Sequence, residues 1–454
     1  MGHNSINLTL PVEQSSFLLP NSSEKDYHRR HHKRSRKKQK VLALETETHF
    51  QIQTLQPGSF QKFRSYTHRH TVSNTVGKWQ DRNCRKSGKT FNHRKWTSSN
   101  LDISNCSDKI VLVSYNILGV DNAAKHPELY RDVSPKYLDW EFRKKLLCKE
   151  VIGYQPSILC FQEVDHFDDL NDLFGKNGFK GVHKARTGEA CDGCAIFWKT
   201  EHFTLLHEES IDFQRFGLRN NVAQLCVLKI NQTGPSGDVI TESPSDTASP
   251  SLVIGNIHGL YNPKRGDIKL GQMRIFLRRA YELSQEWGSI PVVIVGDLNS
   301  LPQSAMYKFL ASSELHTQQH DRRKISCQIY PSEHAKSQVW RNHVWRWTRE
   351  ELMLATGSRN SYLRHPLKLS SAYAKIPGSF KYRDKVGEPL ATSHHSMFTG
   401  TVDYIWHTSD LAPVRVLETL PMHTLKKTGG LPSKEWGSDH LALVCELAFV
   451  NDGN

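Results

Sequence analysis

The chain has 454 residues, of which 37% are hydrophobic, and this is enough to bury one large domain with a tail, or two ordinary domains. Its formal charge of +14 is concentrated at one end, because residues 1–108 hold 19 Lys and Arg against 8 Asp and Glu, which leaves +3 for residues 109–454. The absence of a run of roughly 20 apolar residues, the polar first ten residues and nine dispersed cysteines argue against a membrane or secreted protein and favour reduced thiols.

The first part of the chain lacks the patterns of a folded domain. Residues 1–108 are rich in Ser, Thr, Asn, Gln and His and show no sustained helical or strand period, so we expect a disordered, basic N-terminal extension. Within it, residues 29–40 (RRHHKRSRKKQK) form a dense cationic run. Such a run is typical of a nuclear localisation signal or of an arm that binds RNA non-specifically, and a solvated tail is the third alternative. We expect a protein of the nucleus and cytoplasm, with no membrane attachment.

From Lys109 onward, short apolar runs alternate with amphipathic segments. Two helices are predicted, near 137–152 and 268–287. The apolar runs predict buried strands near 110–113, 157–161, 193–198, 222–230, 251–257, 291–296, 402–406 and 441–448. This alternation predicts one layered α/β domain over residues 109–450.

Two stretches interrupt the pattern. Residues 231–251 are polar and rich in Gly, Pro and Ser, which predicts a mobile loop between two strands. Residues 312–390 read as an insertion, in which Trp340, Trp345 and Trp347 alternate with arginines. One interpretation is a surface that stacks RNA bases. The favoured one is a helix over about 345–355 that packs its aromatic side on the core.

Several predicted strands end in polar residues that suit metal and phosphate chemistry. Hydrolysis of a phosphate ester needs a hard divalent cation, an aligned water, and groups that stabilise the developing charge. Each sequence motif alone is a weak indication, because Asp, Asn and Ser commonly satisfy their own backbone in turns. The ordered set indicates a site more strongly, and its members are Asn116, Glu163, His258, Asp297, Asn299, Asp403, Asp439 and His440.

These residues lie in six motifs: Tyr-Asn-Ile-Leu (115–118), Leu-Cys-Phe-Gln-Glu (159–163), Asn-Ile-His (256–258), Gly-Asp-Leu-Asn-Ser (296–300), Val-Asp-Tyr-Ile (402–405) and Ser-Asp-His (438–440). In this order they resemble the endonuclease/exonuclease/phosphatase superfamily. Further segments at 186–188, 192–195, 221–223 and 261–270 resemble the poly(A) deadenylases of the carbon catabolite repressor protein four type, in particular plant homologues and the related Angel proteins and nocturnin.

The resemblance implies a fold and an activity. The fold is a four-layer α/β sandwich of two packed mixed β-sheets flanked by helices, as in DNase I. The activity is a 3′-to-5′ exoribonuclease that removes poly(A) tails from mRNA and releases 5′-AMP, with one or two Mg²⁺ ions or Mn²⁺ in their place. RNA would be the partner, and deadenylase-complex subunits are further expected partners, although residues 1–108 lack the leucine-rich repeats of the yeast-type founder. The alternatives are a 2′,3′-cyclic phosphatase or nucleotide phosphodiesterase of the same superfamily, and a catalytically silent RNA-binding protein.

The resemblance also implies a role for each site residue. Asp297 would activate the attacking water, His258 would donate to the scissile phosphate, and His440, oriented by Asp403, would stabilise the transition state. The implied metal ligands are Glu163, Asp439, Asn116 and Asn299, and the implied substrate-binding residues are Asn116, Asn221, Asn262 and Asn299. The chain departs from the family at 393–397, where Ser-His-His-Ser-Met replaces the usual aromatic-Asp-Asn stretch.

Overall fold

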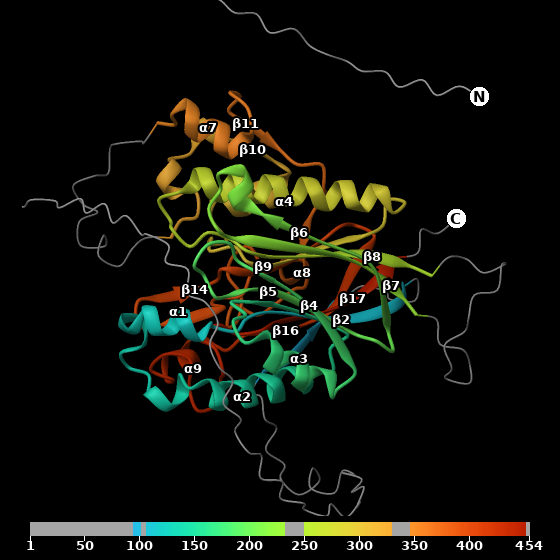
Figure 1. The fold of residues 1–454 in the computed structure, drawn as a ribbon, viewed down its shortest axis with the longest axis vertical. Helices are drawn as coiled ribbons and strands as arrows, with labels where there is room; N and C mark the ends of the chain where they lie inside the picture. Colours follow the sequence, from blue (N-terminus) through green and yellow to red (C-terminus); the bar gives the residue numbers. More distant parts are fainter. Residues whose placement is uncertain (1–93, 101–105, 232–248, 329–345, 451–454) are drawn as a thin grey trace, which may run out of the picture. The chain divides into compact units, whose positions relative to one another are not determined.

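A computed structural model describes residues 94–100, 106–231, 249–328 and 346–450, all within one compact unit, Asn83–Asn454. They form four layers, in which two β-sheets pack face to face and helices cover both outer faces (Figure 1). The predicted sandwich of two mixed sheets is therefore confirmed. Among the described residues, no helix is long and apolar enough to cross a bilayer.

The first sheet has seven strands. Their order is β1 (Trp96–Ser98), β16 (Leu411–Leu417), β17 (Leu443–Val450), β2 (Cys106–Asn116), β3 (Ile158–Gln162), β5 (Gly193–Lys199) and β4 (Phe179–Ala185). Strands β2 and β3 run parallel, with Asn116 opposite Gln162, and the other pairs are antiparallel. Helices α2 (Trp140–Ile152) and α3 (Phe167–Gly175) pack on the outer face of this sheet.

The second sheet has six strands. Their order is β12 (Ser370–Ser371), β15 (Asp403–His407), β9 (Val292–Asp297), β8 (Ser251–His258), β7 (Val222–Ile230) and β6 (Phe203–Asp212). Strands β8 and β9 run parallel, whereas β15 runs antiparallel to β9. Helices α4 (Gly266–Glu286) and α5 (Ala305–Ser312) cover its outer face.

Smaller elements decorate the ends of the sandwich. Two hairpins are β10 (Glu314–His316) with β11 (Tyr362–Arg364), and β13 (Ser393–His395) with β14 (Phe398–Gly400). The further α-helices are α1 (Val120–Lys125), α7 (Arg349–Thr356), α8 (Ala372–Lys375) and α9 (Met422–Lys426). Short 3-10 helices are η1 (Pro127–Tyr130), η2 (Pro135–Tyr137), η3 (Phe213–Phe216), η4 (Thr317–Gln319) and η5 (Arg322–Lys324).

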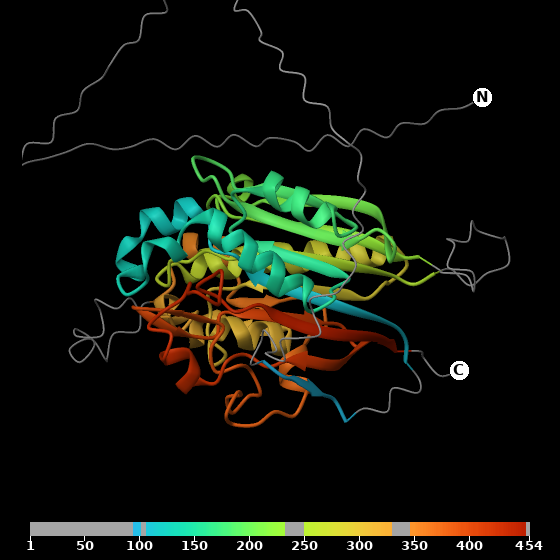
Figure 2. The same ribbon diagram turned by 90° about the horizontal axis from the view of Figure 1, so that it is seen from below.

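The inner faces of the two sheets share an apolar core, which lies between the sheet layers that Figure 1 shows edge-on; Figure 2 shows the same layers from below, one behind another. Leu112 and Ile158 from the first sheet and Ile254 and Val293 from the second belong to it, and all four are fully or almost fully buried. Because helices also cover the outer faces, the central strands are buried on both sides and read as continuous apolar runs. Their rigid ends position the site.

The sheet begins earlier in the chain than predicted. The expectation of disorder up to residue 108 is wrong for residues 94–100, because β1 pairs with the edge strand β16. Arg94 is buried against the same edge and donates from Nε to the Glu418 carbonyl at 2.8 Å. Residues 106–108 belong to β2, so the expectation is wrong there as well, and the rest of the predicted extension, including the basic run at 29–40, lies outside the described residues.

The two interrupting stretches are described in part. Residues 232–248 of the predicted loop 231–251 lie outside the described residues, and the flanking strands β7 and β8 are antiparallel neighbours. In the 312–390 stretch, Thr348 caps α7, and Trp347 packs against the core of the second sheet. The Trp347 indole Nε1 donates to the His320 carbonyl at 3.0 Å. These contacts support the packing interpretation for Trp347, whereas Trp340 and Trp345 lie outside the described residues.

Candidate active site

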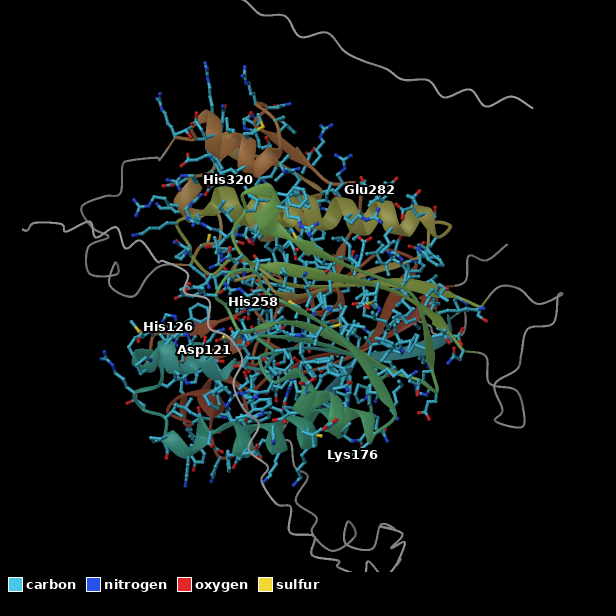
Figure 3. The ribbon with its side chains drawn as sticks, in the orientation of Figure 1. Asp121, His126, Lys176, His258, Glu282 and His320 are labelled. Carbon is cyan, nitrogen blue, oxygen red and sulfur yellow. The ribbon has the colours of Figure 1, made fainter. Side chains whose placement is uncertain are left out.

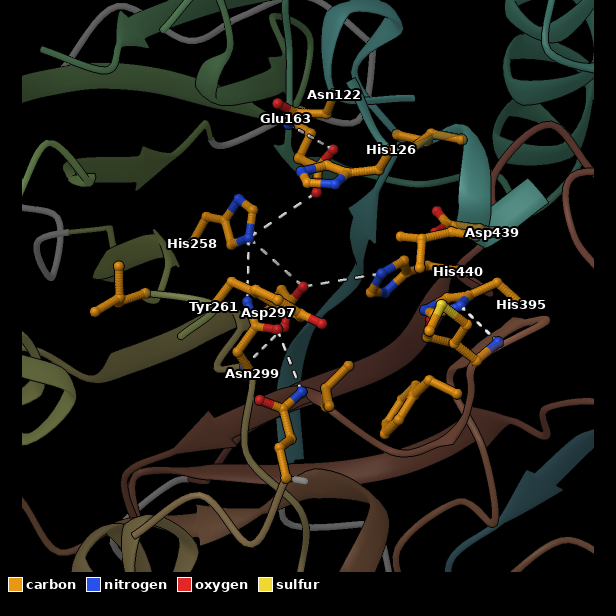
Figure 4. A pocket seen from close by; sticks show the side chains of 18 of the residues that line it. Asn122, His126, Glu163, His258, Tyr261, Asp297, Asn299, His395, Asp439 and His440 are labelled. Atoms are coloured by element: carbon orange, nitrogen blue, oxygen red, sulfur yellow. Dashed lines mark hydrogen bonds and ion pairs between the residues drawn. The ribbon is translucent and has the colours of Figure 1, made fainter. Parts of the chain in front are cut away.

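The strand ends that carry the predicted residues meet at one end of the sandwich. Asn116 ends β2, Glu163 follows β3, and His258 and Asp297 end the parallel strands β8 and β9, where they are register partners. Asp403 begins β15 directly opposite Asp297. Glu163, His258 and Asp297 line a pocket of about 370 Å³, a volume within the usual range of ligand sites (Figure 4). Figure 3 shows His258 at the same end of the sandwich as Asp121 of α1 and His126, which follows that helix.

Glu163 is held in one orientation from three sides. Its Oε1 accepts a hydrogen bond from Asn116 Nδ2 at 2.9 Å, and its Oε2 accepts from Gly119 N at 3.0 Å and Asn122 Nδ2 at 2.9 Å. Its φ of +57° lies in the left-handed region, which costs energy for a residue with a side chain and is typical of functional positions. Burial alone would raise the pKa of Glu163, but the charge of His258 and the two amides outweigh burial and lower it. The carboxylate is therefore ionised at neutral pH.

Asp297 lies at the centre of the pocket floor. Its Oδ1 accepts from Asn299 N at 2.8 Å and its Oδ2 from Asn116 Nδ2 at 3.2 Å. The Nε2 atoms of His258 and His440 lie 3.7 and 3.9 Å from Oδ2. Burial, reinforced by the charge of Asp403, raises the pKa of Asp297. A carboxylate with a raised pKa is a stronger proton acceptor, which suits a general base.

The backbone before Asp297 requires a glycine. Gly296 has a φ of +141°, and a Cβ at this position would collide with the Ile257 carbonyl oxygen of β8. The missing side chain lets β8 and β9 approach closely at their ends. Asn299, two residues after Asp297, adopts a φ of +46° and completes a tight turn. The Gly-Asp-Leu-Asn motif is thus explained by backbone geometry as well as by chemistry.

His440 and Asp403 form a buried pair, with His440 Nδ1 2.8 Å from Asp403 Oδ2. Burial would lower the pKa of His440, but the charges of Asp403 and Asp439 outweigh burial and raise it well above its usual value. The ring is therefore protonated at neutral pH. Ser438 fixes the turn that carries His440, because its Oγ donates to the Asn116 carbonyl at 2.7 Å and accepts from His440 N at 3.1 Å.

The structure gathers nine of the ten predicted site residues. Seven of them line the pocket: Glu163, Asn221, His258, Asp297, Asn299, Asp439 and His440. Asn116 and Asp403 lie behind this wall and hydrogen-bond to it. The exception is Asn262, whose Oδ1 accepts from Lys264 N at 2.9 Å within the turn before α4, while its neighbours Tyr261 and Pro263 line the pocket. A substrate contact of Asn262 stays a prediction.

Other residues of the site follow no strand and were missed by sequence reasoning. Asn122 of α1 orients Glu163, and Tyr130 donates to Asp439 Oδ2 at 3.0 Å. The hairpin β13–β14, where the chain departs from the family stretch, places His395 and Phe398 on the pocket wall with ring centroids 5.9 Å apart. Lys269 of α4 is buried and donates to the Asn299 carbonyl at 2.7 Å.

The donor set fits a hard divalent cation. The pocket wall presents the carboxylates of Glu163, Asp297 and Asp439, and oxygen ligands of this kind suit Mg²⁺ and similar ions. Buried carboxylates in such numbers need a counter-charge. Asp297, Asp403 and His440 can each place one ligand atom within 4.8 Å of the others, which makes them a candidate acidic metal site. Asp403 and His440 already bond each other, so the oxygen ligands around Glu163 remain the predicted set.

Comparison with known proteins decides the family. The model of the Endonuclease/Exonuclease/phosphatase family matches residues 113–440, a range that contains all ten predicted site residues. The chain belongs to this family. Carbon catabolite repressor protein 4 homolog 5 of Arabidopsis thaliana is 57% identical over 373 residues, 79% of this chain and 81% of the relative. Homolog 3 of the same plant is 46% identical over 370 residues, 79% of this chain and 80% of the relative.

A solved structure of the same family gives an independent comparison. ANGEL2, a 2′,3′-cyclic phosphatase crystallised with adenosine-2′,3′-vanadate, is 28% identical and superposes with a TM-score of 0.64. The superposition covers 79% of this chain and 99% of the ANGEL2 chain. Family membership, the shared fold and the assembled carboxylate and histidine groups support a nuclease or phosphatase function for this chain.

Proposed function

We propose that this chain is a Mg²⁺-dependent 3′-to-5′ exoribonuclease that shortens poly(A) tails and releases 5′-AMP. The observation that carries the proposal is the convergence of Glu163, Asp297 and the His440–Asp403 pair on one pocket, because phosphodiester hydrolysis needs all three kinds of group. The deadenylase-like segments of the sequence and the 57% identity to a carbon catabolite repressor protein 4 homologue support RNA as the substrate.

Each group has a distinct part in the hydrolysis. Glu163 and Asn116, with Asp439 and Asn299, would hold Mg²⁺, which when bound neutralises phosphate charge and acidifies water. Asp297 takes the proton of the attacking water, for which its raised pKa suits it. The protonated His440 donates to the charge that develops on the phosphate, and Asp403 fixes the ring and stabilises its charge.

The test uses a 5′-labelled RNA with an A-tail after a mixed-sequence body, incubated with Mg²⁺ and resolved on a denaturing gel. Wild type should produce a ladder that shortens through the tail and pauses at the body, and Glu163→Ala should leave the tail intact. Glu128→Ala is the matched control, because Glu128 also lines the pocket, but its side chain is 41% exposed and pairs with His126. Equal digestion by wild type and Glu163→Ala would sink the proposal.

A second candidate is a 2′,3′-cyclic phosphatase that acts on RNA ends. The observation in its favour is the structural likeness to ANGEL2 over 79% of this chain. The two activities differ in their product: the phosphatase removes a terminal phosphate and keeps every nucleotide, whereas the deadenylase removes nucleotides. RNA that ends in a 2′,3′-cyclic phosphate, incubated beside the A-tailed RNA, separates them. Retention of the complete site argues against a catalytically silent RNA-binding protein.

A further inference from the structure

The pocket wall contains a guanidinium group that the hydrolysis described above does not use. Arg186 follows β4 and lines the pocket with a side chain that is 25% exposed. Its Nη1 donates to Asp192 Oδ1 at 3.2 Å, and Asp192 is buried just before β5. The backbone also ties the two residues together, because Arg186 N donates to the Asp192 carbonyl at 2.9 Å. Arg186 is therefore held at the pocket wall from both its backbone and its side chain.

The hydrogen bonds of this ion pair are incomplete. The pair is monodentate, and the buried atoms Arg186 Nε and Asp192 Oδ2 have no partner among the described residues. Arg186 Nη2 also makes no hydrogen bond within the part of the chain that the structure describes. A guanidinium offers five N–H donors in a fixed fork, so most of its capacity is unused here. A planar fork held beside a pocket in this way suits a phosphate or carboxylate ligand.

The charges around the pocket indicate which ligand it is. Among the described lining residues, Arg186 is the one Lys or Arg side chain, and the lining acids are Glu128, Glu163, Asp297 and Asp439. These four carboxylates repel a polyanionic substrate in the pocket, so Arg186 and a bound cation are the groups that can offset this repulsion there. The scissile phosphate is expected beside Asp297, His258 and His440, which lie close together. Among the described residues, Arg186 contacts none of these three and pairs with Asp192 instead.

We propose that Arg186 binds a second phosphate of the substrate, that of the linkage on the 5′ side of the scissile one. An enzyme that works from the 3′ end has only this phosphate as a neighbour of the scissile linkage. The subsite selects a polynucleotide with two or more phosphates over a mononucleotide or a dinucleoside monophosphate. The proposal rests on the proposed RNA hydrolysis, and it holds equally for RNA that ends in a cyclic phosphate.

The loop position agrees with this role. Thr187 N donates to the Asn220 carbonyl at 3.1 Å, which joins the Arg186 loop to Asn221. Asn221 in turn donates from Nδ2 to the His258 carbonyl at 3.0 Å. These two hydrogen bonds, joined through the Asn220–Asn221 backbone, connect the Arg186 loop to His258, the residue predicted to donate to the scissile phosphate. A substrate that spans both points is positioned along this wall.

The experiment compares three substrates with the full-length chain: the dinucleoside monophosphate ApA, the trinucleotide ApApA, and ApApA with a neutral methylphosphonate in its 5′ linkage. Wild type should show a KM for ApApA about 10 to 100 times lower than for the other two, as the loss of charge-assisted hydrogen bonds implies. Arg186→Ala should raise the KM for ApApA to the value of its neutral analogue and leave ApA unchanged. Arg186→Lys should recover part of the difference, because it restores charge without the fork.

Arg215→Ala is the matched control, since Arg215 also pairs with a carboxylate, Asp212 at 3.4 Å, but lies outside the pocket. It should leave all three KM values unchanged. The proposal would be overturned if Arg186→Ala raised the KM for ApA as much as the KM for ApApA. It would also be overturned if ApApA and its methylphosphonate analogue still differed in KM in Arg186→Ala. If wild type cleaves none of the substrates, the proposed function fails, and the affinities for ApApA and its neutral analogue, measured by calorimetry, decide the subsite. If wild type binds ApApA more tightly than the neutral analogue and Arg186→Ala binds both equally, the subsite is supported. If wild type already binds both equally, the subsite is refuted.

Discussion

His440 Nδ1 lies 2.8 Å from Asp403 Oδ2, and the two residues reach this contact from opposite sheets. Asp403 begins β15 of the second sheet, opposite Asp297 in the strand register, whereas His440 precedes β17 of the first sheet. The pair therefore joins the two sheets at the pocket. It also sets the spacing between the proposed base, Asp297, and the proposed donor, His440, whose Nε2 lies 3.9 Å from Asp297 Oδ2.

Replacing Asp403 with Asn should lower kcat by about 10²- to 10⁴-fold, as for other carboxylates that orient a catalytic histidine. The charge of Asp403 helps to keep the pKa of His440 well above its usual value, so wild-type activity should fall only at alkaline pH. Without that charge the pKa drops, and the alkaline fall should move to lower pH. A pH profile of kcat measures both effects. Exposed Asp410→Asn is the control, and an unshifted alkaline limb in Asp403→Asn would contradict the assignment.

Asn122 should matter for metal use although it is not one of the predicted metal ligands. It donates to Glu163 Oε2 at 2.9 Å and so fixes the carboxylate predicted to bind Mg²⁺. Asn122→Ala should raise the Mg²⁺ concentration for half-maximal rate by about 10- to 100-fold, the usual effect of removing a group that orients a ligand. Asn177→Ala is the control, because Asn177 makes a similar bond, to the Leu173 carbonyl at 2.9 Å, on an exposed helix end. An unchanged Mg²⁺ requirement would show that the hydrogen bonds from Gly119 and Asn116 are enough to orient Glu163.

Arg94 should contribute strongly to stability. It is buried, lies 3.5 Å from Glu150 Oε1, and donates to the carbonyl of Ala442 at 2.5 Å. Arg94→Ala leaves the Glu150 carboxylate buried without its cation, which should lower the free energy of unfolding by about 3–5 kcal/mol. Urea unfolding measures the loss, and the adjacent, exposed Lys95→Ala serves as control. A loss no larger than that of Lys95→Ala would mean that the contacts of the Arg94 side chain with Glu150 and Ala442 do not stabilise the fold.

The predictions from sequence succeeded where buried strands end in polar side chains. Glu163 and Asp297 were located because an apolar run precedes each one, and parallel strands bring their ends to one edge. Asn122 gives no such pattern, since its contact with Glu163 depends on how α1 packs. The substrate contact of Asn262, which the family motif implies, stays a prediction, because its Oδ1 accepts from Lys264 N in the turn before α4 and only its neighbours line the pocket.

The sequence analysis predicted none of the strands β1, β4, β6 and β16, nor the short strands β10–β14, and for β1 and β6 the structure gives a physical reason. Strand β1 has three residues of mixed polarity, and its pairing with β16 is supported by the neighbouring Arg94, which donates to the carbonyls of Glu418 and Ala442, far along the chain. Strand β6 alternates between exposed and inward-facing positions, but one inward residue is Glu209. Arg279 of α4 donates to Glu209 from Nε at 2.7 Å. A charged residue therefore occupies a strand position where the alternating pattern predicts an apolar residue. Neither partner could be identified from the local sequence.

Glu388 should make the stability of the domain depend on pH. It is 1% exposed, and its Oε1 accepts from Tyr307 OH at 2.8 Å. Burial raises its pKa to about 7, against the opposing effects of the Tyr307 hydrogen bond and the Arg383 charge. Because the folded-state pKa exceeds the unfolded value of about 4.3, the folded state holds an extra proton between these pH values. The free energy of unfolding should therefore fall as pH rises from about 4 to about 7, by up to about 3 kcal/mol.

Glu388→Gln removes this titration while keeping an acceptor for Tyr307. Relative to wild type, the variant should gain stability between pH 5 and pH 8, as measured by urea unfolding at both values. Glu435→Gln, at a side chain that is 58% exposed, should show no such change. A stability difference between Glu388→Gln and wild type that stays constant would mean that Glu388 is already ionised in the folded protein at pH 5. Arg383 would then be the group that holds the carboxylate charged, despite its own 2.7 Å pairing with Glu418.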